Sequence, residues 1–174
     1  MDAYQVIVRQ ARAMDSASLQ ALYIELTRDD NVCVIPEKVE AIFVDPRTCL
    51  LVAEMNGQVC GTALVSLCAD VMYGNQPFAV VENFIVAVGA RGNGIGARLM
   101  EYVDSFCRES NCTKVMLLSS ASRVEAHTFF EKAGFAGDKK RGFVKYRRDF
   151  QPAARNAHNA AVDKDTPHAA RVSP

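Results

Sequence analysis

The sequence lacks several features that define common classes of protein. It has no tryptophan, only three histidines and no net charge, because 20 basic side chains balance 20 acidic ones. A balanced chain has neither the basic footprint of a general nucleic-acid binder nor a polyacidic tail. No apolar run reaches the ~18 residues of a membrane span. We therefore expect no nucleic-acid partner and no membrane partner.

The six cysteines do not form a metal or redox motif. None belongs to a C-x-x-C pair and none has a histidine at metal-ligand spacing, so we expect no metal site. Cys60 and Cys68 lie in apolar runs and are interpreted as small core residues. The first ten residues, MDAYQVIVRQ, lack a basic region followed by a long apolar one, which argues against a signal peptide. We expect a cytoplasmic protein whose thiols stay reduced.

The length of 174 residues suits one domain. Residues 151–174 are rich in alanine, asparagine, aspartate and proline and contain almost no large apolar side chain. Such a segment buries too little surface to order itself. The sequence therefore predicts a domain over residues 1–150 followed by a disordered C-terminal tail over residues 151–174.

Strand and helix patterns alternate along the domain. The pair Asn56-Gly57 indicates a tight hairpin, because both turn residues need a positive φ. We predict strands at residues 4–11, 49–55, 58–73, 78–88 and 114–119, helices at residues 16–27, 36–44, 97–110 and 123–133, and a closing pair of strands at Phe135 and residues 142–148. The order β-α-α-β-β-β-α-β-α-β-β predicts an α/β fold with a mixed sheet flanked by helices on both sides.

The most informative segment joins the fourth strand to the third helix. Residues 78–88, FAVVENFIVAV, are polar only at Glu82 and Asn83 and are interpreted as a strand buried on both faces. The glycine-rich turn VAVGARGNGIG, residues 86–96, follows. Glycines let a ligand approach the backbone, and a helix start offers unpaired N–H groups and a positive dipole end. The turn therefore predicts a phosphate seat, to which Arg91 adds a charge.

The spacing of the glycines excludes two familiar loops. A Rossmann loop needs G-x-G-x-x-G, whereas Gly92, Gly94 and Gly96 are spaced G-x-G-x-G. A Walker loop needs Gly-Lys-Ser/Thr, which is absent. The remaining pattern, Arg-x-x-Gly-x-Gly, resembles the acyl-CoA pyrophosphate loop of the GNAT family, the Gcn5-related N-acetyltransferases. Residues 123–135, RVEAHTFFEKAGF, resemble the late helix of that family, A-x-x-F-Y-E-K-x-G-F. The resemblance covers residues 4–150 and implies the GNAT fold.

The resemblance implies acetyl-CoA as co-substrate and assigns residues to it. The pantetheine arm pairs with the fourth strand, the loop holds the pyrophosphate, and the thioester sits where the fourth and fifth strands splay apart. The acceptor amine enters from the opposite side. The expected cofactor-binding residues are Phe84, Ile85, Val86, Val88, Arg91, Gly92, Asn93, Gly94, Ile95, Gly96, Ala97, Arg123 and Phe130. Arg123 alternatively is a solvated arginine in the first turn of its helix.

Glu82 is the expected general base. An amine is protonated at neutral pH, and a carboxylate in an apolar strand has a raised pKa that suits proton removal. Its position also resembles the catalytic glutamate of the histone acetyltransferase branch of the family. Alternatively, Glu82 is structural, paired with a basic side chain or placed at a strand bulge. Asn83, Ser119 and Ser120 are expected to contact substrate, although the two serines alternatively cap the next helix.

Phe130 departs from the family pattern. A tyrosine often stands there, and its hydroxyl can protonate the departing thiolate. Phe130 is therefore interpreted as core packing, which leaves the general acid unidentified. His127 is interpreted as packed or hydrogen-bonded in preference to a proton-transfer role. The basic run KKRGFVKYRR, residues 139–148, is interpreted as a solvated hairpin in preference to an anion site. Acidic residues near the end of the first helix either attract a cationic amine or are surface charges: Glu25, Asp29 and Asp30.

These observations predict an N-acetyltransferase that acts without a covalent intermediate. The acetyl group passes from acetyl-CoA to a primary amine, with Glu82 accepting its proton. The late helix resembles small-molecule members of the family, including aminoalkylphosphonate acetyltransferases, which indicates a small-molecule acceptor. The alternative is an acyl-CoA-binding sensor that has lost catalysis. Phe130 supports this alternative, because it lacks the hydroxyl that protonates the departing thiolate. Dimers are common in this family, so a homodimer is one expectation.

Overall fold

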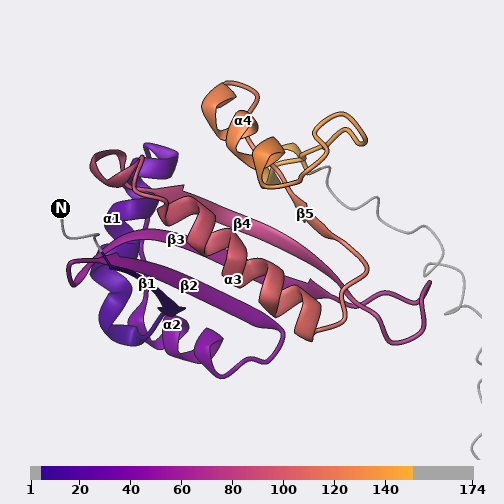
Figure 1. Ribbon diagram of the computed structural model, residues 1–174, viewed down its shortest axis with the longest axis horizontal. Coiled ribbons are helices and arrows are strands. Elements are labelled where there is room, and N and C mark those ends of the chain that lie inside the picture. Colours follow the sequence, from indigo (N-terminus) through magenta and orange to yellow (C-terminus); the bar gives the residue numbers. More distant parts are fainter. Residues whose placement is uncertain (1–4, 151–174) are drawn as a thin grey trace, which may run out of the picture. The chain divides into compact units, whose positions relative to one another are not determined.

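A mixed sheet of five strands forms the centre of residues 5–140 (Figure 1). The computed structural model describes residues 5–150, which divide into two units between Lys140 and Arg141. Each unit is treated separately below. The predicted tail, residues 151–174, lies outside the described residues, as does Tyr4 at the predicted start of the first strand.

The strands lie side by side in the order in which the chain forms them. Pairings between the first four strands are antiparallel, and the last pairing is parallel, which gives the predicted mixed sheet. The strands are β1 Val6–Gln10, β2 Thr48–Met55, β3 Gln58–Cys68, β4 Phe78–Val86 and β5 Val115–Leu117. Parallel strands require a long crossover connection, and a helix lies in the segment that joins β4 to β5.

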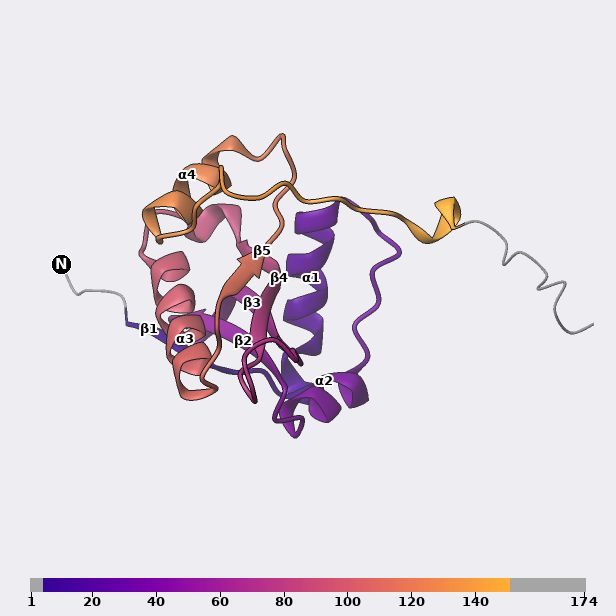
Figure 2. The same ribbon diagram turned by 90° about the vertical axis from the view of Figure 1, so that its right-hand side faces the viewer.

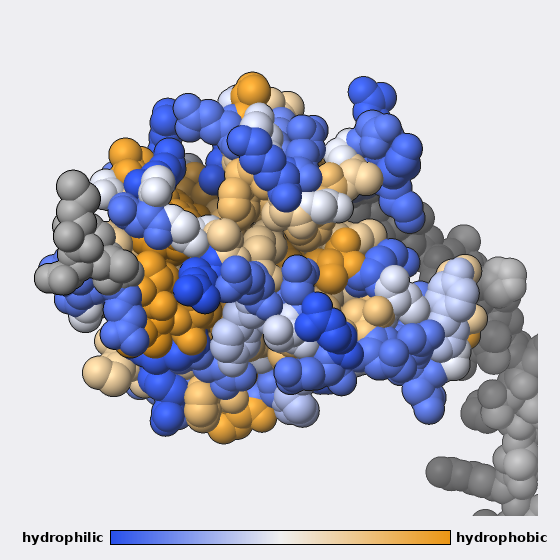
Figure 3. Space-filling view, viewed as in Figure 1, coloured by the Kyte–Doolittle hydropathy of each residue, from blue (hydrophilic) through white to orange (hydrophobic). Residues whose placement is uncertain are grey.

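Helices cover both faces of the sheet, as predicted. In Figure 2 the sheet is seen near its edge, with α1 and α2 on one side and α3 on the other. The helices are α1 Ser16–Thr27, α2 Pro36–Phe43, α3 Ile95–Glu109 and α4 Val124–Lys132, and short 3-10 turns occupy Ala13–Asp15, Val88–Ala90 and Arg147–Asp149. Each face has its own cluster of buried apolar side chains. Figure 3 shows mainly polar residues on the outward surface of α3.

The tight hairpin between β2 and β3 is confirmed. Asn56 and Gly57 both have positive φ, 54° and 76°, and Met55 pairs directly with Gln58. Further along β3, Gly61 lets α3 approach the sheet closely. A Cβ atom at Gly61 would lie only 3.1 Å from the Ile95 side chain and 3.2 Å from that of Leu99. The start of α3, which carries the glycine turn, is thereby held against the sheet.

A β-bulge in β4 changes which face its residues occupy. Leu64 pairs with Glu82 and Thr62 with Ile85, so two steps along β3 match three along β4. Asn83 lies in this extra step with a φ of 53°. Before the bulge Val81 belongs to the core under α3, and after it Phe84 packs against the same core. Alternation along the strand therefore places Glu82 on the face that α1 and α2 cover.

The structure corrects two expectations about β4 and β5. The strand over residues 78–88 is not buried on both faces, because the bulge leaves Glu82 and Asn83 exposed to solvent, and it ends at Val86. The predicted strand over residues 114–119 shortens to Val115–Leu117. A strand persists only where a neighbour pairs with it, and the parallel pairing of β4 with β5 covers three residues on each strand.

The closing pair of strands is wrong. Residues 133–150 contain no strand within the described part of the chain. The N–H of Phe135 donates to the carbonyl of Phe130, so Phe135 belongs to the turn that follows α4, in which Gly134 has a φ of 94°. Residues 141–150 are all exposed. None of these residues is buried, so no apolar core is present there to stabilise a strand.

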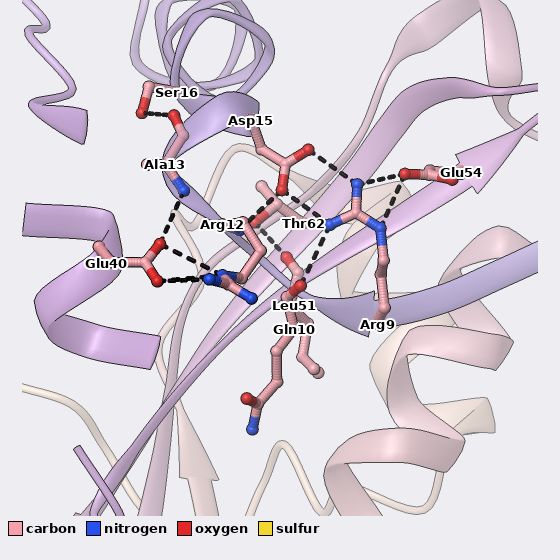
Figure 4. Close-up of polar contacts among 10 residues, drawn as sticks. All are labelled: Arg9, Gln10, Arg12, Ala13, Asp15, Ser16, Glu40, Leu51, Glu54 and Thr62. Atoms are coloured by element: carbon pink, nitrogen blue, oxygen red, sulfur yellow. Dashed lines mark hydrogen bonds and ion pairs between the residues drawn. The ribbon is translucent and has the colours of Figure 1, made fainter. Parts of the chain in front are cut away.

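An ion-pair network ties β1 to the start of α1 and to β2 (Figure 4). Arg9 donates two hydrogen bonds to the Asp15 carboxylate, of 2.7 and 2.8 Å, and also contacts Glu54. Asp15 additionally accepts the Arg12 N–H at 2.8 Å. Asp15 directly precedes α1, but its side chain contacts β1 and makes no capping hydrogen bond to the helix.

Candidate active site

A cavity of about 710 Å³ lies where β4, the start of α3 and the start of α4 meet. Its volume falls within the range of small-molecule and cofactor sites. Figure 3 shows an apolar recess between α4 and the start of α3. The cavity is lined by Phe84, Ile85, Val86, Ala90, Arg91, Gly92, Gly94, Ile95, Gly96, Ala97, Ser122, Arg123, Val124, Glu125, Ala126, Phe129 and Phe130.

The glycine turn forms the polar end of this cavity. Gly92 and Gly94 have φ values of 82° and 76°, in the left-handed region that favours glycine. Gly94 precedes α3 without a side-chain cap, so the first N–H groups of the helix have no partner within it. The Asn93 side chain donates to the carbonyls of Ala90 and Arg91, which holds the turn in shape. These groups and the helix dipole favour an anion here.

Aromatic side chains form the apolar wall. The rings of Phe84 and Phe129 stack at 5.5 Å between centroids, and Phe130 meets both edge-on. Gly96 lies under this wall, because a Cβ there would approach the Phe129 ring to 3.1 Å. Phe130 is only 6% exposed, so its interpretation as core packing is confirmed, although its ring also borders the cavity.

Beside the cavity, β4 continues where its pairing with β5 has stopped. The paired residues end at Val81 and Leu117, whereas β4 runs on to Val86. This agrees with the expected separation of the fourth and fifth strands. Within residues 5–140, the peptide groups on this side of β4 therefore have no partner strand after Val81, and such an edge can pair with an extended ligand.

Glu82 lies at this parting of the strands but outside the cavity lining. Its side chain is exposed, so the expected burial in an apolar strand is wrong. Within residues 5–150 its carboxylate takes part in no ion pair. Of the two structural alternatives for Glu82, an ion pair with a basic side chain is therefore not observed in these residues. A position at a β-bulge is observed.

The segment between β5 and α4 carries three serines that the structure distinguishes. The Ser119 hydroxyl oxygen is buried and has no hydrogen-bond partner in the described chain. The hydroxyl groups of Ser120 and Ser122 lie 3.0 Å apart. His127 Nε2 donates to the Ser120 carbonyl at 2.9 Å, which confirms that this histidine is hydrogen-bonded. Of the three serines, only Ser122 lines the cavity.

This arrangement matches a known family. The model of the acetyltransferase (GNAT) family matches residues 13–135. The chain belongs to this family. It is a GNAT N-acetyltransferase, and its α/β sheet flanked by helices is the GNAT fold.

Two curated relatives of this GNAT protein are distant matches that cover most of both chains. An aminoglycoside N(6')-acetyltransferase type 1 of Stenotrophomonas maltophilia is 25% identical over 149 residues, which cover 84% of this chain and 95% of the relative. An aminoalkylphosphonate N-acetyltransferase of Salmonella typhimurium is 23% identical over 129 residues, 74% and 83% of the two chains. A solved putative acetyltransferase from Agrobacterium tumefaciens superposes with a TM-score of 0.72 at 26% identity, covering 80% of this chain and 99% of that one.

The site of this GNAT protein fits the anionic and apolar parts of acetyl-CoA. The left-handed glycines keep side chains off the turn, and two arginines, Arg91 and Arg123, border the cavity with the starts of α3 and α4. An anionic pyrophosphate suits that end. The aromatic wall suits an apolar arm. Ser119, close in sequence to the lining residue Ser122, has a buried hydroxyl that makes no hydrogen bond within the described chain and can therefore bond to a ligand. In residues 5–150, no cluster of three potential ligands is placed to hold a metal ion.

The structure brings together most, but not all, of the residues expected at the cofactor. Val88 and Asn93 do not line the cavity, because the Val88 N–H is bound to Glu25 and the Asn93 side chain folds back on the turn. The Glu25 carboxylate accepts the Val88 N–H, and the Asp29 carboxylate accepts hydrogen bonds from Asn31. The lining residues that sequence reasoning missed are Ala90, Ser122, Val124, Glu125, Ala126 and Phe129.

The missed residues share a location, since most of them lie at the start of α4. In the sequence, the resemblance of residues 123–135 to the late helix of the family was the signal that pointed to this helix. Which helix end meets the glycine turn depends on the parallel crossover, and that placement is a tertiary property. Among residues 5–150, no helix is both long and apolar enough to span a bilayer.

Proposed function

We propose that this GNAT protein transfers the acetyl group of acetyl-CoA to a primary amine of a small molecule. The observation that carries the proposal is the cavity itself, with the glycine turn and the start of α3 at one end and the unpaired edge of β4 beside it. The names of the two curated relatives, which act on aminoglycosides and aminoalkylphosphonates, support a small-molecule acceptor.

Acetyl-CoA supplies an activated acetyl thioester, and the chain supplies binding and orientation. N–H groups of the turn and of the first turn of α3 hold the pyrophosphate. Peptide groups of β4 beyond Val81 hold the extended arm, and the aromatic wall excludes water from it. Fixing both reactants in this way lowers the entropic part of the barrier. The amine approaches from the face of the sheet that carries Glu82.

Glu82 is the proposed general base. Alternation through the bulge places it on the α1 face, and its exposed carboxylate is free to reach an amine directly or through one water. Phe130 cannot protonate the leaving thiolate. A thiol with a pKa of about 8.5 can depart without a dedicated acid, or take its proton from water.

The test is release of free thiol from acetyl-CoA in the presence of aminoglycosides, aminoalkylphosphonates and other small primary amines. We expect turnover with at least one of these classes. For Glu82→Gln we expect kcat to fall about 10²- to 10⁴-fold, because a general base contributes about that factor, while CoA binding stays unchanged. Glu37→Gln, an exposed glutamate of α2, serves as the control with full activity.

Two outcomes would contradict parts of the proposal. Full activity of Glu82→Gln would show that another group removes the proton. Tight CoA binding by the wild-type protein without turnover of any amine would favour the alternative of an acyl-CoA-binding sensor. Sedimentation of the same preparation tests the expected homodimer.

A further inference from the structure

Glu25 reaches from α1 to the segment that leads into the glycine turn. Its carboxylate oxygen Oε1 accepts the backbone N–H of Val88 at 3.0 Å and lies 4.0 Å from Nη2 of Arg91. Val88 begins the 3-10 turn Val88–Ala90, which directly precedes Arg91. One side chain of α1 thus contacts both the backbone and the arginine at the entrance to the cavity.

The Arg91 side chain is held from a second direction. Its Nε donates to the Val86 carbonyl at 3.2 Å, at the last residue of β4. The guanidinium therefore lies between a strand carbonyl and the carboxylate of Glu25, while Arg91 itself borders the cavity. Since α1 packs against β3 and β4, the carboxylate is presented by a rigid element.

We propose that Glu25 is a positioning residue for the cofactor loop, an inference that rests on the proposed binding of acetyl-CoA. Its carboxylate fixes the Val88–Ala90 turn and the direction of Arg91 before the pyrophosphate binds. It thereby lowers the conformational entropy that the loop loses on binding. The proposed role differs from attraction of the acceptor amine, because Oε1 of Glu25 already contacts the loop.

Two effects of Glu25 on an anionic ligand oppose each other. Its negative charge repels a pyrophosphate, whereas its hydrogen bond orders the N–H groups and the arginine that bind it. The side chains of Glu25 and Arg91 are 37% and 48% exposed, so solvent screens the charge effect. The hydrogen bond from Val88 is charge-assisted and does not depend on long-range attraction. Positioning therefore outweighs repulsion.

Two substitutions of Glu25 separate the effect of its side-chain length from the effect of its charge. Glu25→Asp keeps the charge but is one methylene too short to reach the Val88 N–H, and we expect its dissociation constant for CoA to rise about tenfold, the loss of one hydrogen bond to a charged group. Glu25→Gln loses the charge but keeps an acceptor oxygen at the same reach, and we expect a change of about twofold or less. Glu109→Ala, at an exposed glutamate at the end of α3, is the control that removes a charge away from the cavity.

The measurement is isothermal titration of the full-length protein with CoA, accompanied by thermal melting and steady-state kinetics. Positioning predicts a higher KM for acetyl-CoA in Glu25→Asp, with kcat and the KM of the amine retained. Unchanged binding by Glu25→Asp, or CoA binding by Glu25→Gln that is tighter than wild type by clearly more than about twofold, would overturn the inference while leaving the proposed function intact. A wild-type protein that binds no CoA would overturn the proposed function and the role of Glu25 together.

Discussion

At the scale of single residues, some charged side chains hold secondary-structure elements together, and others are proposed to bind the ligand. Asp15 is 4% exposed and accepts hydrogen bonds from both Arg9 and the Arg12 backbone. Those from Arg9 contribute most to holding the pKa of the Asp15 carboxyl below its usual value, against the opposing effect of burial. A charge buried in this way is tolerated only because its partners remain in place.

Asp15 should make the free energy of unfolding depend on pH in the acidic range. Its pKa is lower in the folded state than in the unfolded chain, so its contribution is complete above the unfolded pKa of about 4 and is lost as the pH falls through the folded value. We expect Asp15→Asn to cost about 3 kcal/mol at pH 7, as for a broken buried pair, and to flatten the loss of stability below pH about 4. Urea unfolding across this pH range measures both.

The comparison needs a variant that removes a carboxylate without removing an anchor. Asp104→Asn, at an exposed position of α3, should keep the stability and the acid profile of the wild-type protein. If Asp15→Asn and wild type lost stability in parallel between pH 5 and pH 2, Asp15 would not be the group that couples folding to protonation.

At the scale of elements, the turn between β4 and α3 owes its shape to backbone conformation. Gly89 and Gly94 both lie in it, and a Cβ at either position would meet nothing within 4 Å. They differ in φ, because only Gly94 is left-handed. The two positions therefore separate the conformational role of glycine from any need for space.

Alanine at these two positions should have opposite consequences. Gly94→Ala forces a side chain into the left-handed region and should destabilise the protein by about 1–2 kcal/mol. It should also weaken CoA binding, because the N–H groups that start α3 reorient. Gly89→Ala should be neutral or stabilising by up to about 1 kcal/mol. Chemical denaturation of the two variants measures the difference, and equal destabilisation would contradict a role for φ.

At the scale of the whole molecule, one sheet supports two separate cores and presents the cavity at one end. Leu99 and Val103 of α3 are fully buried against one face, and Leu19 of α1 against the other. Both helices also reach the cofactor loop, α3 through its first turn and α1 through Glu25. A ligand in the cavity therefore contacts elements whose packing holds the fold together.

Ligand binding should consequently stabilise the fold. CoA at 100 times its dissociation constant should add about 2.7 kcal/mol, which corresponds to a rise of about 5–10 °C in Tm for a chain of this size. NAD should cause no shift, since the glycine spacing departs from the dinucleotide-binding pattern. Differential scanning fluorimetry measures both ligands, and a shift with NAD alone would revive a Rossmann-type reading of the turn.

Much of the fold follows from local patterns. The spacing of apolar residues placed all four helices within a few residues of their observed ends, and Asn56-Gly57 placed the hairpin. The closing strands were wrong because Phe143, Val144 and Tyr146 are residue types that favour a strand, whereas a strand also requires a neighbour to pair with. A local pattern contains no information about that neighbour.

The same division applies to the site. Arg91, Gly94 and Gly96 by themselves predicted the turn that leads into α3, because left-handed backbone and a helix start are encoded in a few consecutive residues. The exposure of Glu82, the start of α4 at the cavity and the bond from Glu25 to Val88 were decided only by tertiary structure. Glu25 and Val88 are 63 positions apart. Their contact exists because α1 packs across β3 and β4, and packing between distant segments leaves no local trace in the sequence.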